Sequence, residues 1–497
     1  MINTDTIRVH APAAESAVAT FAARAVGAPG ATTTAQVVDR FAPVAAAAPP
    51  VPATPPSAVW APPAPSDIRA TGLSPNGLLQ LLVKTLYTGE ASGSVLADRL
   101  CLTYSVIDPL VDHVRAERLV EVRGASGVGN AGYRYALTDL GRDRARQFLD
   151  VNQYVGPVPV PLAQYVAAIR DIAARRPRLD RSNIARGFEH LVVGPAMLDQ
   201  LGPAVNSGKA VFLYGPPGNG KTVIAEGIGR TLGGDMYVPH AVDVDGQIIT
   251  VFDPVNHEPL GVACDAGPAV VHHSGEGDRR WVHVKRPVVV VGGELTLDML
   301  DLTFNPISRF YEAPIQVKAN GGVFVVDDFG RQRIRPRDLL NRWIVPLESR
   351  IDFLTLHTGK KFEVPFDVLI VFATNLRPES LADEAFLRRI PYKIYAKNPT
   401  LEEFGRIFEM NCRRAGVAFD PVVIEYLVRR YYRPRQIEMR ACHPRDIVNH
   451  VLDLASYENR PAAITRELLD AACASYFLEE TDHQAAGRVA EPTVTEI

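Results

Sequence analysis

The sequence predicts a mixed α/β fold with a parallel β-sheet at its core and an all-helical domain after it. Three apolar runs support this prediction. Residues 210–214 lead into a glycine-rich octapeptide and then a helical pattern, residues 323–326 end in two aspartates, and residues 368–374 end in Asn375. Buried strands of a parallel sheet read as continuous apolar runs, and the residues that follow them gather along one edge.

The composition is that of a globular protein with several domains. The chain has 497 residues, more than one hydrophobic core usually supports, and 47% of them are hydrophobic. The 53 basic and 56 acidic side chains leave a net charge of -3, which indicates no bulk attraction to nucleic acid or to a membrane surface. The five cysteines contain no Cys-x-x-Cys pair, so we expect reduced thiols rather than disulfides or a zinc finger.

Neither a membrane span nor a secretory signal is predicted. The longest purely apolar stretches, such as Val288 to Val291, are far shorter than the roughly 20 residues that cross a bilayer. The first residues contain Asp5 and no positively charged region ahead of an apolar run. We therefore expect a cytoplasmic protein.

Residues 1–70 are predicted to form a disordered arm. They are rich in alanine and proline, with nine prolines between Pro43 and Pro65, and this composition favours an extended, solvated chain. The alternative for residues 14–26 is a short amphipathic helix that docks on a partner.

Residues 71–150 have the pattern of three helices, around 78–86, 95–100 and 104–118, followed by two strands, 119–122 and 133–138. This order resembles a winged helix. The third helix carries Asp108, Asp112 and Glu117 against Arg115 and Arg118. Because DNA binding needs basic residues to neutralise phosphates, we favour protein docking and keep DNA readout as the alternative. Residues 151–185 are predicted to be a linker with a short helix.

The octapeptide fits Gly-x-x-x-x-Gly-Lys-Thr at every fixed position. It consists of Gly215, Pro216, Pro217, Gly218, Asn219, Gly220, Lys221 and Thr222. The glycines let backbone N–H groups turn toward phosphates, the lysine reaches the β- and γ-phosphates, and the threonine hydroxyl can ligate magnesium. With a strand before it and a helix after it, we expect this loop to bind ATP and Mg²⁺, whereas a chance glycine-rich turn is the alternative.

Four further elements follow the phosphate loop: the acidic pair Asp327 and Asp328, the amide of Asn375, two arginines in 381–390, and the run 442–447. Together the five elements resemble, in order, the motifs of the AAA+ ATPase superfamily over roughly residues 186–480. The resemblance implies an α/β ATPase domain at 186–397 and an α-helical lid at 398–481, leaving 482–497 as a tail. A helical pattern after Lys397, with one apolar face, agrees with the lid.

The resemblance also implies roles for these residues. Asp327 would hold magnesium through its water shell, and Asp328 stands where the family usually has a glutamate that polarises the attacking water. Aspartate is one methylene shorter, so hydrolysis could be slow. Asn375 would bind the γ-phosphate or the attacking water, the alternative being a turn residue at a strand end.

Arginines complete the implied site. Arg388 or Arg389 would act as a finger in the site of a neighbouring subunit, which requires assembly, usually as a hexamer in this family. The alternative is a surface cation or an interface ion pair. Arg445 would reach the nucleotide from the lid, and its alternative is an ordinary arginine at a helix start.

The long separation of Lys221 and Asp327 indicates a β-rich insertion at about 240–318, with strand patterns at 247–252, 280–284 and 287–291. Residues 351–357 and 361–364 predict a hairpin that resembles an insertion of the branch with MoxR-like ATPases and enhancer-binding activators, whose members use such protrusions on partners. We expect scattered surface residues, not a metal site, at the histidines near Cys264, because their spacing is irregular. They are His240, His257, His272, His273 and His283.

Three functions follow from these expectations. The first is an oligomeric ATPase that remodels a protein client in the manner of a chaperone. The second is a nucleotide-gated transcription regulator that binds DNA through the winged helix. The third is a scaffold that binds ATP but barely hydrolyses it, which the substitution at Asp328 keeps open.

Overall fold

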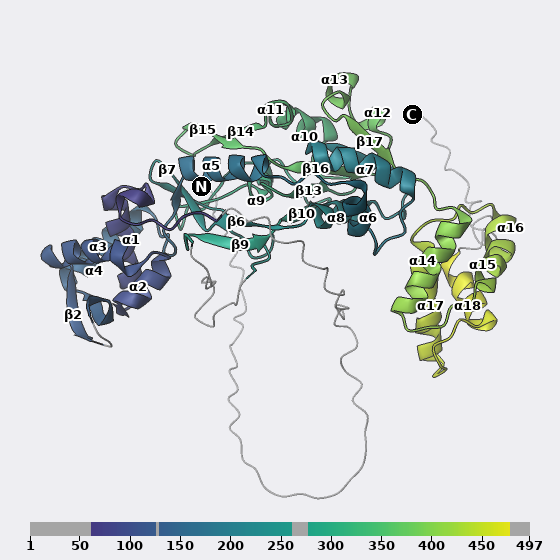
Figure 1. Ribbon diagram of the computed structural model, residues 1–497, viewed down its shortest axis with the longest axis horizontal. Helices are drawn as coiled ribbons and strands as arrows, with labels where there is room; N and C mark the ends of the chain where they lie inside the picture. The colour runs from purple at the N-terminus through teal and green to yellow at the C-terminus, as the bar shows by residue number, and fades with distance from the viewer. Residues whose placement is uncertain (1–60, 126–128, 261–276, 478–497) are drawn as a thin grey trace, which may run out of the picture. The chain divides into compact units, whose positions relative to one another are not determined.

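The computed structural model describes residues 61–125, 129–260 and 277–477 (Figure 1). The predicted arm up to residue 60, its docking helix at 14–26, the tail at 482–497 and the residues Cys264, His272 and His273 lie outside the described residues. Within the described ranges, every helix is too short or too polar to cross a membrane.

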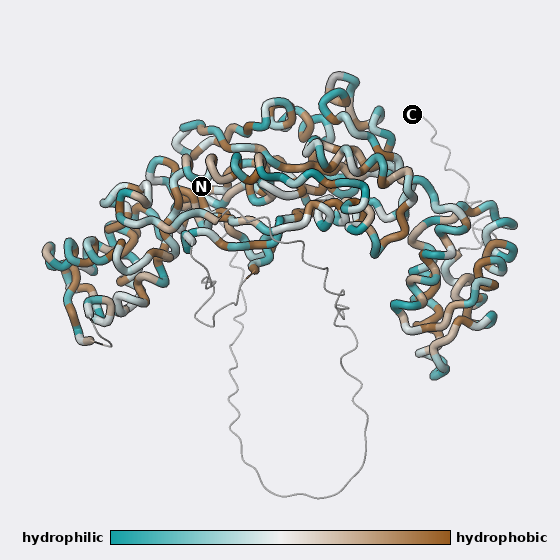
Figure 2. The backbone as a smooth tube through the Cα atoms, in the orientation of Figure 1, coloured by the Kyte–Doolittle hydropathy of each residue, from teal (hydrophilic) through white to brown (hydrophobic). Residues whose placement is uncertain are grey.

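The core of the molecule is a five-stranded parallel sheet in the order β10-β13-β16-β5-β17. The strands are β5 (Val211–Tyr214), β10 (Val288–Val291), β13 (Val323–Val326), β16 (Leu369–Thr374) and β17 (Tyr392–Tyr395). Hydrophobic stretches, brown in Figure 2, run through these strands. The predicted α/β fold with a parallel sheet is confirmed.

Alternate residues of each core strand pack on opposite faces of the sheet, as the two-residue period of a strand requires. One face, with Leu213, Val325 and Val371, packs against helices from the chain around the phosphate loop. These are α6 (Arg181–Gly187), α7 (Pro195–Ser207) and α8 (Lys221–Leu232). The other face, with Phe324 and Phe372, packs against later helices. These are α10 (Pro336–Arg342), α11 (Ile344–Ser349), α12 (Pro378–Leu381) and α13 (Glu384–Leu387).

Strand β10 corrects the predicted extent of the insertion. Its four valines were assigned to the insertion, but they pair in parallel with β13 and form the edge of the core sheet. An edge strand can be as apolar as an inner one when a helix covers its face, and a methyl group on Gly229 of α8 would come 2.2 Å from Val288 Cγ2. The sequence pattern alone does not distinguish these two locations.

The β-rich insertion forms two smaller sheets. One pairs β6 (Asp235–Pro239) with β9 (Trp281–Lys285), antiparallel. The other has the order β11-β12-β8-β7-β4. Its strands are β4 (Val160–Pro161), β7 (Ala241–Val244), β8 (Gln247–Thr250), β11 (Thr303–Phe304) and β12 (Tyr311–Glu312). The short segments η3 (Asp298–Leu300) and α9 (Ile315–Lys318) then lead to β13.

The predicted hairpin is confirmed as β14 (Ile351–Thr355) and β15 (Lys361–Pro365), which pair antiparallel. Leu354, Phe362 and Val364 are buried in the same hydrophobic cluster as the insertion strands. Near the tip, Lys360 forms an ion pair with Asp245 of the β7–β8 turn. The hairpin therefore packs on the insertion.

The segment predicted to be a linker with a short helix contains a helix and also a strand. Its residues Val160 and Pro161 form β4, which pairs with β7, and 162–174 form helix α5 (Leu162–Ala174). Tyr165, Ala168 and Ile169 are buried on one face of α5, at the spacing of a helix that covers a sheet. The neighbouring prolines suggested a linker, but Pro161 directly precedes the first helical turn, where proline needs no N–H partner.

The N-terminal module, residues 69–151, has four α-helices and a three-stranded antiparallel sheet in the order β1-β3-β2. The helices are α1 (Pro75–Tyr87), α2 (Gly93–Leu100), α3 (Tyr104–Ala116) and α4 (Asp139–Val151), and the strands are β1 (Ala91–Ser92), β2 (Val120–Ala125) and β3 (Tyr133–Leu137). Ser74 caps α1 by accepting a hydrogen bond from the N–H of Gly77. Leu82 and Ile107 are fully buried in the shared core of these elements.

The C-terminal helical domain follows the core sheet, as predicted after Lys397. Its elements are α14 (Leu401–Arg414), α15 (Val422–Leu427), the π-helix η4 (Val428–Tyr432), α16 (Arg433–Arg435), α17 (His443–Tyr457) and α18 (Arg466–Tyr476). Thr400 begins α14 with a capping box, in which its side chain and that of Glu403 each satisfy a backbone N–H. Phe404, Phe408 and Val451 lie in the buried core of this domain.

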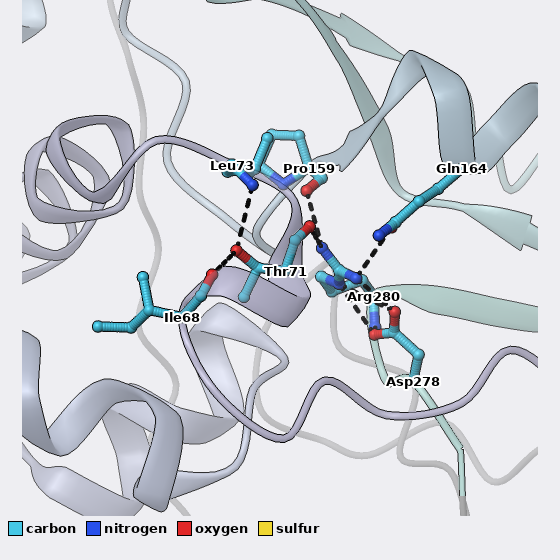
Figure 3. A network of polar contacts seen from close by, with 7 residues as sticks. All are labelled: Ile68, Thr71, Leu73, Pro159, Gln164, Asp278 and Arg280. Carbon is cyan, nitrogen blue, oxygen red and sulfur yellow. Dashed lines mark hydrogen bonds and ion pairs between the residues drawn. The ribbon is translucent and has the colours of Figure 1, made fainter.

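A buried arginine joins the N-terminal module to the insertion (Figure 3). The Arg280 guanidinium pairs with Asp278 at 2.7 Å, and both side chains are buried. Its Nη1 donates to the carbonyl oxygen of Thr71 at 2.9 Å, and its Nη2 donates to Oε1 of Gln164 at 3.2 Å. Since a buried charge is tolerated only when it is paired and hydrogen-bonded, this network fixes three segments that are distant in the sequence.

We expect Arg280→Met to lower the free energy of unfolding by about 3–5 kcal/mol, because it leaves the buried Asp278 carboxylate without its partner. Arg279→Met is the matched control, since Arg279 pairs with Asp98 at the surface and its removal should cost about 1 kcal/mol or less. Urea unfolding followed by circular dichroism measures both. Equal stability of the two variants would show that the network is not needed for folding.

Candidate nucleotide-binding site

The phosphate loop joins the end of β5 to the start of α8. Gly215 has φ +150°, and a methyl group there would come 2.4 Å from the carbonyl oxygen of Ala396. Gly218 has φ +79°, and a methyl group there would come 2.5 Å from Sγ of Cys442. Both positions therefore require glycine, for backbone conformation and for space. The loop ends at Gly220, the residue before the first turn of α8, where free backbone N–H groups favour an anion.

Lys221 is buried beneath this loop. Its Nζ donates to the carbonyl oxygens of Gly215 at 3.1 Å and Pro216 at 2.9 Å, and to Oδ1 of Asn375 at 2.6 Å. Burial lowers the pKa of the Lys221 ammonium, an effect that the nearby Asp328 and Asp327 carboxylates partly oppose. The lysine is thus held by neutral acceptors that the oxygens of a phosphate can replace.

The acidic pair lies at the end of the neighbouring strand β13. Thr222 Oγ1 donates to Oδ2 of Asp327 at 2.7 Å. A hydroxyl and a carboxylate are oxygen ligands of the kind that Mg²⁺ prefers, directly or through water. These two residues fit a magnesium ion bound with a nucleotide.

Asp328 and Asn375 form the far side of the site. Asn375 Nδ2 donates to Oδ1 of Asp328 at 3.2 Å, while its Oδ1 accepts from Lys221. One amide therefore connects the ammonium and the carboxylate. The structure brings together Lys221, Thr222, Asp327, Asp328 and Asn375, the five residues expected to meet at one edge of the sheet.

Asp328 adopts a left-handed backbone conformation, with φ +48°. The turn that holds it is closed by Gln332, whose Nε2 donates to the carbonyl oxygen of Asp327 at 2.8 Å and whose Oε1 accepts from the N–H of Gly330 at 2.8 Å. Aspartate and asparagine adopt this conformation more readily than longer side chains. Gln332 was not singled out from the sequence, and no motif marks it.

A segment of the helical domain also contacts the phosphate loop. The N–H of Cys442 donates to the carbonyl oxygen of Gly218 at 2.8 Å, and Arg440 Nη1 donates to that of Pro217 at 2.8 Å. Asn219 Oδ1 accepts from the N–H of Ala441 at 3.3 Å. The sequence does not predict a contact of Arg440 with the phosphate loop. Its position just before the start of α17 is the only sequence feature that points to this contact.

Asn219 also connects the loop to the end of β17. Its Nδ2 donates to Oδ1 of Asn398 at 2.7 Å, and Asn398 Nδ2 donates to Oε2 of Glu438 at 2.8 Å. A variable position of the motif is thus the centre of a network between the core and the helical domain.

The remaining predicted arginines lie at other places. Arg445 is near the start of α17, but its guanidinium pairs with Asp446 and its side chain is 63% exposed. Arg388 follows α13 and forms an exposed pair with Glu384. Arg389 Nε donates to Oε1 of Glu348 at 2.6 Å. Their proposed functions require contacts with a nucleotide or a second subunit.

The histidines correct one expectation. His240 and His257 are buried rather than on the surface. His257 Nδ1 accepts from the N–H of Asp253 at 2.9 Å, so its Nε2 donates to the carbonyl oxygen of Lys318 at 2.8 Å. This histidine joins two loops through hydrogen bonds to the backbone, a role that sequence spacing does not reveal. Among the described residues, no group of three or more histidine, cysteine or acidic side chains could hold a metal ion.

Comparisons with known proteins match parts of the chain. Residues 400–475 match a family described as "Domain of unknown function (DUF8689)". A stretch of 54 residues is 46% identical to the vesicle-fusing ATPase of Dictyostelium discoideum and covers 11% of this chain and 7% of that protein.

Some solved structures are similar in fold to this chain. NtrX from Brucella abortus has a TM-score of 0.36 and 15% identity, over 58% of this chain and 57% of that chain. The RuvB Holliday junction branch migration motor of Thermotoga maritima has a TM-score of 0.33 and 15% identity, over 62% and 77%. The chain thus spans little more than half the length of NtrX, and likenesses at these TM-scores carry no inference about function.

The backbone at Asp328 gives a prediction about this position. Asp328→Glu should lower the free energy of unfolding by about 1 kcal/mol, because glutamate is less favourable in the left-handed region. Asp328→Asn should stay within about 0.5 kcal/mol of wild type. Urea unfolding of the three proteins measures the difference, and a glutamate variant as stable as wild type would contradict the strain argument.

Proposed function

We propose that this protein is an AAA+-type ATPase that hydrolyses ATP with Mg²⁺. The observation that carries the proposal is a pair of adjacent hydrogen-bonded sets at the carboxyl edge of the sheet, Lys221–Asn375–Asp328 and Thr222–Asp327. The phosphate loop supplies the anion site beside these sets. The short match to a vesicle-fusing ATPase supports the same activity.

Each residue of these sets has a task that its chemistry permits. Lys221 exchanges its carbonyl and amide acceptors for phosphate oxygens and stabilises their charge. Thr222 and Asp327 hold the magnesium ion, which when bound neutralises phosphate charge. Asp328 accepts a hydrogen bond from the attacking water and orients it, while Asn375 keeps the Asp328 carboxylate turned toward the site.

The proposed active form is a homo-oligomer, a hexamer on the resemblance, with sites shared between subunits. Arg388 or Arg389 supplies a guanidinium to the phosphates bound by the adjacent subunit. The supporting observation is that Arg388 is a highly exposed cation whose ion-pair partner in the described part of the chain is the exposed Glu384. Such surface pairs contribute little and are easily exchanged for a stronger anion.

The proposed work of the ATPase is remodelling of a protein client. The insertion and the hairpin share one hydrophobic cluster, so they move as one body when the core changes shape. Arg445, together with the contacts of Arg440 and Cys442 on the phosphate loop, couples the helical lid to nucleotide binding. The N-terminal module is proposed to be a winged helix that docks a protein, since Arg115 of α3 is paired with Asp112 of the same helix.

Phosphate release by wild type, Lys221→Ala and Lys209→Ala tests the enzymatic proposal. Lys221→Ala should lose activity by about 100-fold or more, because the charge that stabilises the transferred phosphoryl group is gone. Lys209 is exposed just before β5 and serves as the matched control, which should keep wild-type activity. Equal rates for wild type and Lys221→Ala would leave an ATP-binding scaffold as the better description.

Mixing two inactive variants tests the shared site. Lys221→Ala lacks a working phosphate loop, and Arg388→Ala/Arg389→Ala lacks both candidate fingers. Mixed subunits should recover part of the wild-type phosphate release, because some interfaces then combine an intact loop with an intact arginine. No recovery at any mixing ratio, with assembly verified by sedimentation, would count against sites shared between subunits.

A further inference from the structure

Four arginines stand in one seven-residue segment shortly after the acidic pair. Arg331, Arg333, Arg335 and Arg337 alternate with other residues from the turn after β13 into the first turn of α10. All four are exposed, and within the described ranges none of their side chains has an acidic partner within ion-pair distance. Clusters of like charge without partners raise the local potential and are typical of surfaces that bind the opposite charge.

Several other surface arginines of the described chain have acidic partners. Arg413 pairs with Glu409 and Arg429 with Glu425, each one helical turn away. The neighbouring Arg342 of α10 pairs with Asp352 at 2.6 Å. What distinguishes 331–337 is that four arginines without such a partner stand together in one short segment.

A second loop extends this cluster. Arg377 is exposed two residues after Asn375, and its side chain too has no acidic partner in the described ranges. The two loops are in contact, since a methyl group on Gly330 would come 3.1 Å from Cδ1 of Leu376 and 2.8 Å from Cδ2 of Leu381. The arginine surface thus consists of Arg331, Arg333, Arg335, Arg337 and Arg377.

We propose that the arginine surface binds an acidic polypeptide segment of the client, next to the nucleotide site. Guanidinium groups recognise carboxylates through paired hydrogen bonds, and five of them match a short acidic stretch. Leu376 is 42% exposed at this surface and offers an apolar contact to such a peptide. The proposal rests on the proposed function for the identity of the client as a protein.

Nucleic acid is the competing polyanion, and the surroundings of the arginine surface disfavour it. Binding of single strands relies on exposed aromatic rings that stack with bases. The aromatic residues closest in sequence, Phe329 and Trp343, are buried. A duplex would need a longer basic track than five arginines on a chain with net charge -3.

The position of the arginine surface predicts an effect on catalysis. The segment begins three residues after Asp328, and the N–H of Arg331 donates to the carbonyl oxygen of Asp328 at 2.9 Å. On the other loop, Arg377 lies two residues after Asn375. A peptide bound here orders both loops that hold the catalytic carboxylate and its amide partner, so it should stimulate ATP hydrolysis.

Fluorescence anisotropy with labelled peptides tests the inference on the full chain. The probe is a 12-residue Glu/Leu peptide, and the same peptide with glutamine in place of glutamate is the neutral comparison. We expect the acidic peptide to bind at least about tenfold more tightly, with an affinity that falls as salt rises. Arg333→Glu/Arg335→Glu should weaken its binding about tenfold and abolish the stimulation, while basal phosphate release remains.

Arg142→Glu/Arg178→Glu is the matched control, because it makes the same change of net charge at two exposed arginines elsewhere. It should bind the acidic peptide like wild type, and thermal unfolding checks that both double variants are folded. Equal binding by both double variants, or tighter binding of a labelled DNA duplex than of the acidic peptide, would overturn the inference. If the protein hydrolyses ATP but does not bind the peptide, only the proposal about the arginine surface is refuted. If it binds the peptide but does not hydrolyse ATP, only the proposed ATPase activity is refuted.

Discussion

The hydrogen-bond register of β5, β16 and β13 determines where the residues of the candidate site lie. Val326, the last residue of β13, pairs with Phe372, and Thr374, the last of β16, pairs with Tyr214 of β5. Bonds beyond the strand ends continue this order: the N–H of Phe329 donates to Ala373 and that of Gly215 to Thr374. A slip of one residue would turn the acidic pair and Asn375 to opposite faces, so the positions of these side chains depend on backbone pairing between buried strands of the core sheet.

This constraint explains why local conformations around the site are special. The chain turns directly after β13, and this turn places Asp328 at φ +48° and is closed by the hydrogen bonds of Gln332. Aspartate satisfies this backbone requirement and still supplies a carboxylate, whereas glutamate would extend further but fit the turn less well. Aspartate at this position therefore combines the backbone conformation of the turn with a carboxylate at the candidate site.

Much of the core sheet and of the candidate site is predictable from the sequence, because apolar runs and the residues that follow them are local features. The five residues of the site follow such runs, so the sequence predicts them. The four valines of β10 fit a strand of the insertion and a strand of the core sheet equally well, so the sequence pattern does not place β10 correctly. Residues 151–185 are predicted from the sequence to be a linker with a short helix, since a contact that folds them, the pairing of Val160 with Val242, is distant in the sequence. The sequence does not predict the roles of Arg440 and Gln332, because both roles depend on hydrogen bonds that form only in the folded chain.

The chain path from the site shows how a client could influence both catalysis and the insertion. The arginine surface leads into α10, where Arg342 pairs with the buried Asp352 of the hairpin. Gln316 of α9 donates to the same carboxylate at 3.0 Å, which ties the hairpin to the end of the insertion. An acidic segment bound at Arg333 and Arg335 is thus linked to Asp328 on one side and to the hairpin on the other by packed, hydrogen-bonded structure. Coupling between two sites needs a connecting element that can adopt two conformations. The turn at Asp328 is the element whose conformational equilibrium both ATP and the client would shift.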